Sequence, residues 1–190
     1  MEKERIAIGI SNGMNISTTP VGLIIERKWF SSNTLFLTVF TIAWYGFLLN
    51  WYTNIPNIWP INAENMMAAL FPLIHVSVGI SLTYYVIASY FNKTTVTVSP
   101  SVVESRITPI PFGFKKSITS KSIEQVYCKE VTTEGRNRKH VSYEVRVVLK
   151  DQRHIGLVSG FESSEQALFL QQEIEAYLGI KDVSVKGELA

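Results

Sequence analysis

The side chains best able to bind a metal or attack a substrate are few in this chain and lie far apart in the sequence. They are His75, Cys128, His140 and His154. His140 and His154 can meet across a hairpin with strands over 141–150 and 153–159, but two histidines without a third ligand make a weak zinc site. Cys128 alternates with Val126 in a predicted strand, where a thiol packs as a small apolar group. A nucleophilic cysteine would also need a neighbouring base, and the sequence places none.

The signatures of common enzyme classes are missing from the sequence. It holds no phosphate-binding loop of the Walker type, no G-x-S-x-G elbow, no H-E-x-x-H pair and no paired cysteines. We therefore expect no catalytic residue, no cofactor and no metal ion, and the chain is predicted not to be an enzyme.

Basic residues in two predicted loops are candidate contacts for anionic lipid or for a protein partner. They are Lys115 and Lys116 in one loop, and Arg136, Arg138 and Lys139 at a hairpin tip. Membrane surfaces attract such clusters, although most charged hairpin tips are simply solvated. The formal net charge of only +2 and the lack of a concentrated basic stripe argue against a nucleic-acid partner.

His75 is a candidate polar site inside a membrane, because it lies in a long apolar segment together with Pro72. Ionisable groups in such segments are costly and often functional. The plainer interpretation is a neutral imidazole that hydrogen-bonds Thr38, Thr41 or Tyr45 on a facing helix. A proton-relay or metal role is the alternative, and Pro72 is expected to act as a kink or a first-turn proline.

The elements that position these residues are set by an uncharged stretch. From Trp29 to Ala63 no side chain is charged, and after Glu64 none is charged until Lys93. Crossing a hydrocarbon core of about 30 Å takes roughly 20 apolar residues in a helix. We therefore predict a transmembrane helical hairpin over 29–92, with spans at about 30–51 and 66–91. Small residues can bring its helices close together: Ala43, Gly46, Ser77, Gly79 and Ser81.

Lysine and arginine set the expected orientation, because basic residues resist translocation. The leader carries Lys3, Arg5, Arg27 and Lys28, and Lys93 follows the second span, whereas the connecting loop carries no basic residue. We expect an integral protein of a bacterial inner or plasma membrane, or an equivalent one, with both termini cytoplasmic.

The leader, residues 1–28, is predicted to form a β-hairpin that joins a sheet supplied by the tail. Apolar residues alternate over 6–11 and 21–28, and a longer loop between these strands fits the alternation better than a turn at Asn12-Gly13.

The tail, residues 93–190, is predicted to be a cytoplasmic β domain closed by a helix. Strands are expected at about 94–98, 102–108, 122–131, 141–150 and 153–159, with a further short strand or loose tail over 182–186. An amphipathic helix over 163–178 is capped by Ser163, with Gln166 in capping-box position, and ends at Gly179.

Seven strands and a closing helix are the count of a pleckstrin-homology-like (PH-like) domain. The chain resembles a group of bacterial membrane proteins with two spans and a PH-like domain. The resemblance rests on residues 92–98, 109–111, 123–127 and 173–180. It implies an α+β membrane protein in which a transmembrane hairpin is combined with a PH-like β-barrel or sandwich, and it transfers no active-site residue.

Besides an enzyme of an unrecognised type, three functions are left open by the sequence. The first is a scaffolding or interaction module at the cytoplasmic face, with a protein partner or a second copy of the chain. The second is a domain that senses anionic lipid through the basic loops. The third is a small subunit of a membrane transport complex that uses His75.

Overall fold

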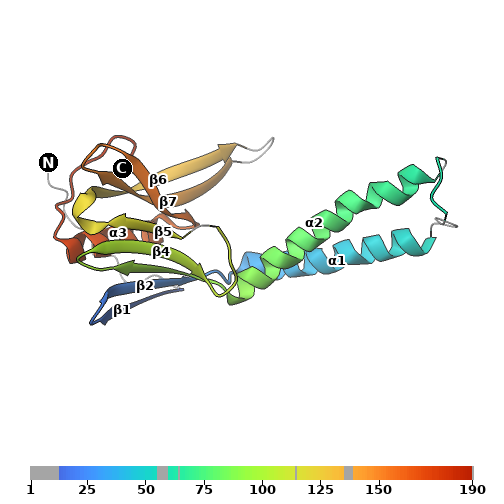
Figure 1. Cartoon of the computed structure of the whole chain (residues 1–190), viewed down its shortest axis with the longest axis horizontal. Coiled ribbons are helices and arrows are strands. Elements are labelled where there is room, and N and C mark those ends of the chain that lie inside the picture. Colours follow the sequence, from blue (N-terminus) through green and yellow to red (C-terminus); the bar gives the residue numbers. More distant parts are fainter. Residues whose placement is uncertain (1–12, 55–59, 64, 114, 135–138, 190) are drawn as a thin grey trace. The chain divides into compact units, whose positions relative to one another are not determined.

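The computed structural model describes residues 13–54, 60–63, 65–113, 115–134 and 139–189, and within them the chain is an α+β protein (Figure 1). It divides into two compact units. One is Trp29–Asn92, and the other combines the chain before and after that segment. We call them the helical unit and the β unit.

Two long helices make up the described part of the helical unit. They are α1 (Ser32–Asn54) and α2 (Met66–Phe91), and both are long and apolar enough to cross a membrane. Most of their apolar side chains are exposed, as expected for helices that face lipid rather than a protein core. Pro72 lies inside α2 and is buried.

Five antiparallel strands of the β unit form a sheet in the order β1-β2-β3-β4-β5. The strands are β1 (Met14–Thr19), β2 (Gly22–Lys28), β3 (Lys93–Val98), β4 (Val102–Thr108) and β5 (Lys116–Thr119). Strands β2 and β3 pair in unbroken register from Leu23↔Val98 to Lys28↔Lys93. The helical unit is therefore inserted between two neighbouring, fully paired strands.

The leader hairpin is placed differently from the sequence prediction. Residues 14–19, which were expected to lie in a long loop, form β1, and a two-residue turn at Pro20-Val21 joins it to β2. The side chains of Met14 and Ile16 pack on the core, so β1 has its own two-residue alternation. The predicted strand over 6–11 lies outside the described residues.

The remaining strands form a second antiparallel sheet in the order β6-β7-β8, followed by a helix. After a short 3-10 turn (Ser120–Ser122), these elements are β6 (Ile123–Glu134), β7 (Lys139–Leu149), β8 (His154–Phe161) and α3 (Ser164–Leu178). The Ser163 hydroxyl accepts a hydrogen bond from Glu165 N at 3.2 Å, and Gly179 ends α3 with φ 66°. Both ends of this helix follow from the residue types at its caps.

One apolar core joins the two sheets and α3. It includes Ile25, Val96 and Val98 from the first sheet, Val126, Cys128, Val145 and Val147 from the second, and Ala167, Leu170 and Ile174 from α3. Within the described residues the strands form two separate sheets rather than a closed barrel, so the barrel alternative is wrong. Strands β5 and β8 belong to different sheets and are not paired with each other. A side chain connects them instead, because Lys116 Nζ of β5 donates a hydrogen bond to Gly156 O of β8 at 2.7 Å.

Candidate functional site

His75 lies among aromatic rings of the helical unit rather than among hydroxyl groups. Its ring stacks on Trp44 with centroids 5.6 Å apart and packs against Phe47 at 6.0 Å and Phe71 at 4.7 Å. Its Nδ1 lies 3.3 Å from the carbonyl oxygen of Phe71, one helical turn back. These contacts suit an imidazole ring that packs between the two helices.

The hydroxyls expected to bind His75 have other partners. Thr41 donates to Leu37 O at 2.7 Å in its own helix, a common arrangement for threonine in a helix. Tyr45 OH lies 3.0 Å from Thr83 Oγ1, and Thr38 Oγ1 lies 3.2 Å from Tyr90 OH. The last two contacts join α1 to α2. A third polar contact between the helices is made by Trp44, whose Nε1 donates to His75 O at 2.9 Å.

Of the small residues expected at the helix contact, Gly79 lies close to side chains of the facing helix, whereas Gly46 does not. A Cβ atom built on Gly79 would lie 3.3 Å from Tyr45 Cζ and 3.4 Å from Trp44 Cδ1, whereas one built on Gly46 meets nothing within 4 Å. The close approach of the helices therefore depends on Gly79.

Three of the basic residues expected to contact lipid or a partner lie within the described residues, and each has its own partner in the chain. Lys115 forms an ion pair with Glu104 at 2.8 Å, and Lys139 lies 3.7 Å from Glu134 with both side chains largely exposed. Lys116 instead points into the β unit and bonds Gly156 O. Arg136 and Arg138 lie outside the described residues. Whether any of them contacts lipid or a partner stays a prediction.

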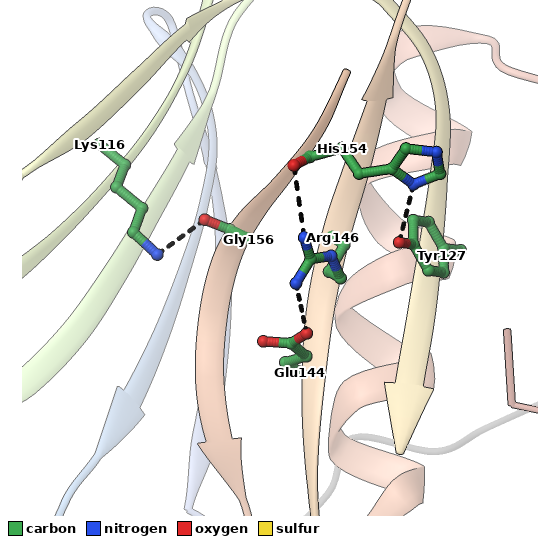
Figure 2. Close-up of polar contacts among 6 residues, drawn as sticks. All are labelled: Lys116, Tyr127, Glu144, Arg146, His154 and Gly156. Atoms are coloured by element: carbon green, nitrogen blue, oxygen red, sulfur yellow. Dashed lines mark hydrogen bonds and ion pairs between the residues drawn. The ribbon is translucent and has the colours of Figure 1, made fainter. Parts of the chain in front are cut away.

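A polar cluster that the sequence did not single out crosses the second sheet (Figure 2). Tyr127 of β6 and Arg146 of β7 are direct cross-strand partners. The hydroxyl of the buried Tyr127 lies 2.9 Å from His154 Nδ1 of β8. Arg146 Nη1 donates to Glu144 Oε1 at 2.7 Å, and its Nη2 donates to His154 O at 3.3 Å. The hydrogen bond that Arg146 donates to Glu144 raises the pKa of Arg146 above its usual value.

Cationic side chains bind backbone carbonyls of β8, which is an edge strand of its sheet. The acceptors are His154 O, Gly156 O and Gly160 O, and their donors are Arg146, Lys116 and Arg27. Arg27 also lies over the Phe161 ring, 4.5 Å from its centroid. Edge carbonyls bound in this way cannot accept a further strand. These three cations therefore cover carbonyls along the described edge of this sheet.

His140 and His154, which the sequence allows to meet across a hairpin, are not brought together. His140 lies opposite Thr133 near one end of β7, whereas His154 lies opposite Val148 near the other. Eight residues of strand separate Val148 from His140, roughly 26 Å at the usual rise per residue. In the described residues no three His, Cys, Asp or Glu side chains are grouped as metal ligands.

Two glutamines bind a buried carboxylate beneath α3. Gln171 and Gln125 point their amide nitrogens at Glu175 Oε1, at 3.2 Å and 3.4 Å, and Glu175 is fully buried. The amides satisfy part of the hydrogen-bonding capacity of this carboxylate, as burial requires. The contact ties the C-terminal helix to β6.

No protein-family model matches this chain, and no curated protein matches it significantly.

Proposed function

We propose that this chain is a membrane-anchored interaction module, in which a PH-like β unit scaffolds or regulates a protein partner at the cytoplasmic face. The observation that carries the proposal is the place of the helical unit between paired strands. The connections are short, since β2 ends at Lys28 and α1 begins at Ser32, while α2 ends at Phe91 and β3 begins at Lys93. A domain attached to two spans by such short segments stays next to the membrane, where its partners must be.

The PH-like part of the proposal is supported by the make-up of the β unit. Two antiparallel sheets and a C-terminal helix contribute to one core. The described residues contain eight strands: six of the seven expected, together with β1 and β5, while the expected strand over 6–11 lies outside the described residues. The cations Arg27, Lys116 and Arg146 bind carbonyls of the edge strand β8, which is a structural use of their charge.

The orientation in the proposal rests on charge. The described part of the connection between α1 and α2 holds no lysine or arginine, whereas Arg27, Lys28 and Lys93 lie at the ends of β2 and β3. Basic residues flank the cytoplasmic side of membrane spans. Both ends of the chain are thus assigned to the cytoplasm.

Photo-crosslinking of the full chain in its own membrane tests the proposal. A crosslinking amino acid replaces the exposed Lys150 of the β unit or, as the matched position, the exposed Val39 of α1. We expect one defined protein adduct from position 150, recovered in stoichiometric amount in mild detergent, and lipid adducts from position 39. A monomer without an adduct at position 150 contradicts the proposal. An adduct found only at position 39 points instead to a membrane complex formed through the spans.

A further inference from the structure

We propose that the phosphate of an anionic phospholipid headgroup binds on the outer face of the five-stranded sheet, at Lys28, Lys93 and Arg106. We call these three residues the basic triad. The inference rests on the membrane anchorage proposed above and adds a lipid site that differs from the basic loops. It does not depend on which protein is the partner.

The face that carries the basic triad follows from strand alternation. Leu23 and Ile25 of β2 pair with Val98 and Val96 of β3, and all four side chains are buried in the core. Side chains at odd offsets from these positions point to the opposite face. That outer face carries Glu26 and Lys28 from β2, Lys93 and Thr95 from β3, and Glu104, Arg106 and Thr108 from β4.

The register brings the basic triad within reach of one phosphate group. Lys28 lies directly opposite Lys93, and Lys93 lies directly opposite Thr108, which places Arg106 on the diagonal. Directly opposed side chains have Cβ atoms about 5 Å apart, and diagonal ones about 7–8 Å. Long basic side chains at these separations can converge on the oxygens of one phosphate.

The described outer face carries more positive than negative charge, which favours the binding of an anion. Each of its carboxylates already has a cation, since Glu26 pairs with Lys93 and Glu104 pairs with Lys115. Lys28 and Arg106 are exposed and form no ion pair within the described residues. Like charges directly opposite on neighbouring strands are destabilising. At the Lys28↔Lys93 pair Glu26 already offsets part of this repulsion, and a bound phosphate would offset the rest.

The connections to the spans favour a lipid over a soluble phosphate compound. Lys93 lies two residues after Phe91, and Lys28 lies four residues before Ser32. At 3.8 Å between successive Cα atoms, these residues are at most about 8 Å and about 15 Å from the helix ends. Lipid phosphates lie just outside the hydrocarbon core, and anionic lipid attracts basic residues next to a span.

Lipid binding to the full chain tests the proposal. The protein is purified in mild detergent, mixed micelles supply phosphatidylglycerol or phosphatidylcholine, and bound lipid is counted by native mass spectrometry. We expect the wild type to prefer phosphatidylglycerol. The double variant Lys28→Gln/Arg106→Gln should bind it about 25-fold more weakly, at about fivefold for each basic residue removed.

A charge-matched variant separates the site from a general charge effect. Lys121→Gln/Lys150→Gln removes two exposed lysines from turns elsewhere in the β unit and should keep the lipid preference. If the double triad variant does not fold, the single changes Lys28→Gln and Arg106→Gln should each weaken binding about fivefold. An unchanged preference in the triad variants, or an equal loss in the control, overturns the proposal. Displacement of the lipid by inorganic phosphate overturns the choice of a lipid ligand. None of these results depends on the partner crosslink at position 150.

Discussion

The side chain of Arg146 links β7 to β8 in addition to the backbone pairing of these strands. It bonds the carboxylate of Glu144 in its own strand and the backbone of His154 in β8. The ion pair is largely shielded from water, with side chains 25% and 16% exposed. The pair of Arg153 and Asp151 has the same 2.7 Å separation, but its side chains are 71% and 53% exposed. Because water screens exposed pairs, burial rather than distance should decide what each contributes to stability.

We expect Arg146→Met to destabilise the protein by about 2 kcal/mol, because it leaves a partly buried carboxylate without its charged hydrogen-bond donor. This corresponds to a fall in Tm of roughly 4–8 °C for the full chain in detergent. Adding Glu144→Gln should restore part of the loss, since the orphaned charge is then gone. Arg153→Met is the exposed control and should leave Tm unchanged. Equal losses at the two arginines would contradict the argument from burial.

At the scale of the elements, close packing of α1 against α2 positions the polar groups of the apolar helical hairpin. Gly79 lets the rings of Trp44 and Tyr45 approach α2, and these residues then make polar contacts with His75 and Thr83. One small residue therefore permits two contacts between the helices. Tight packing of this kind is what holds helices together in lipid, where burial of apolar surface provides no drive.

Gly79→Leu should separate the helices and destabilise the hairpin by roughly 1–3 kcal/mol, the usual cost of overpacking. Trp44 lies at the contact, so thermal unfolding followed by tryptophan fluorescence in detergent will report the change. Gly46→Leu is the matched control, because open space surrounds that position and no loss is expected. A loss at Gly46 as large as that at Gly79 would show that the helices pack through another face.

The sequence was sufficient for elements with strong local signals. The uncharged runs predict both spans, and Ser163 with Gly179 marks the ends of α3. Strand β5 was missed because it has four residues with one buried apolar side chain, Ile118. Strand β1 was missed because a more regular alternation over 6–11 competed with it.

Contacts between elements were beyond the reach of sequence patterns. The partners of His75 depend on the rotation of α1 against α2, which periodicity within either helix does not determine. The Tyr127–Arg146 pairing depends on the register of β6 against β7 and has no signature of its own. The basic triad was missed for the same reason, since 65 positions separate Lys28 from Lys93 in the chain and only the β2–β3 register joins them.

At the scale of the whole molecule, the insertion of the helical unit between β2 and β3 leads to a test of which side of the membrane each segment faces. Ends of the chain on one side of the membrane require the connection between α1 and α2 on the other. The native Cys128 is fully buried, so it contributes little background to thiol labelling.

Single cysteines at Ile61→Cys and Lys150→Cys should report opposite sides of the membrane. Both original residues are exposed, one between the helices and one in the turn after β7. A membrane-impermeant maleimide should label position 61 from outside intact cells and position 150 only in inverted vesicles. Labelling of both positions from the same side would contradict the assigned orientation.

The β2–β3 pairing also bears on the order of events during synthesis. Strands β1 and β2 leave the ribosome before the helical unit, and β3 leaves only after it. The five-stranded sheet therefore cannot be completed until both spans have been made. The helical unit also brings its own ends together, since Trp29 N donates to Asn92 O at 3.1 Å. Closing the sheet across this insertion thus resembles closing a short loop, with little of the entropic cost of a long one. Under the proposed membrane anchorage, insertion of the hairpin precedes completion of the five-stranded sheet.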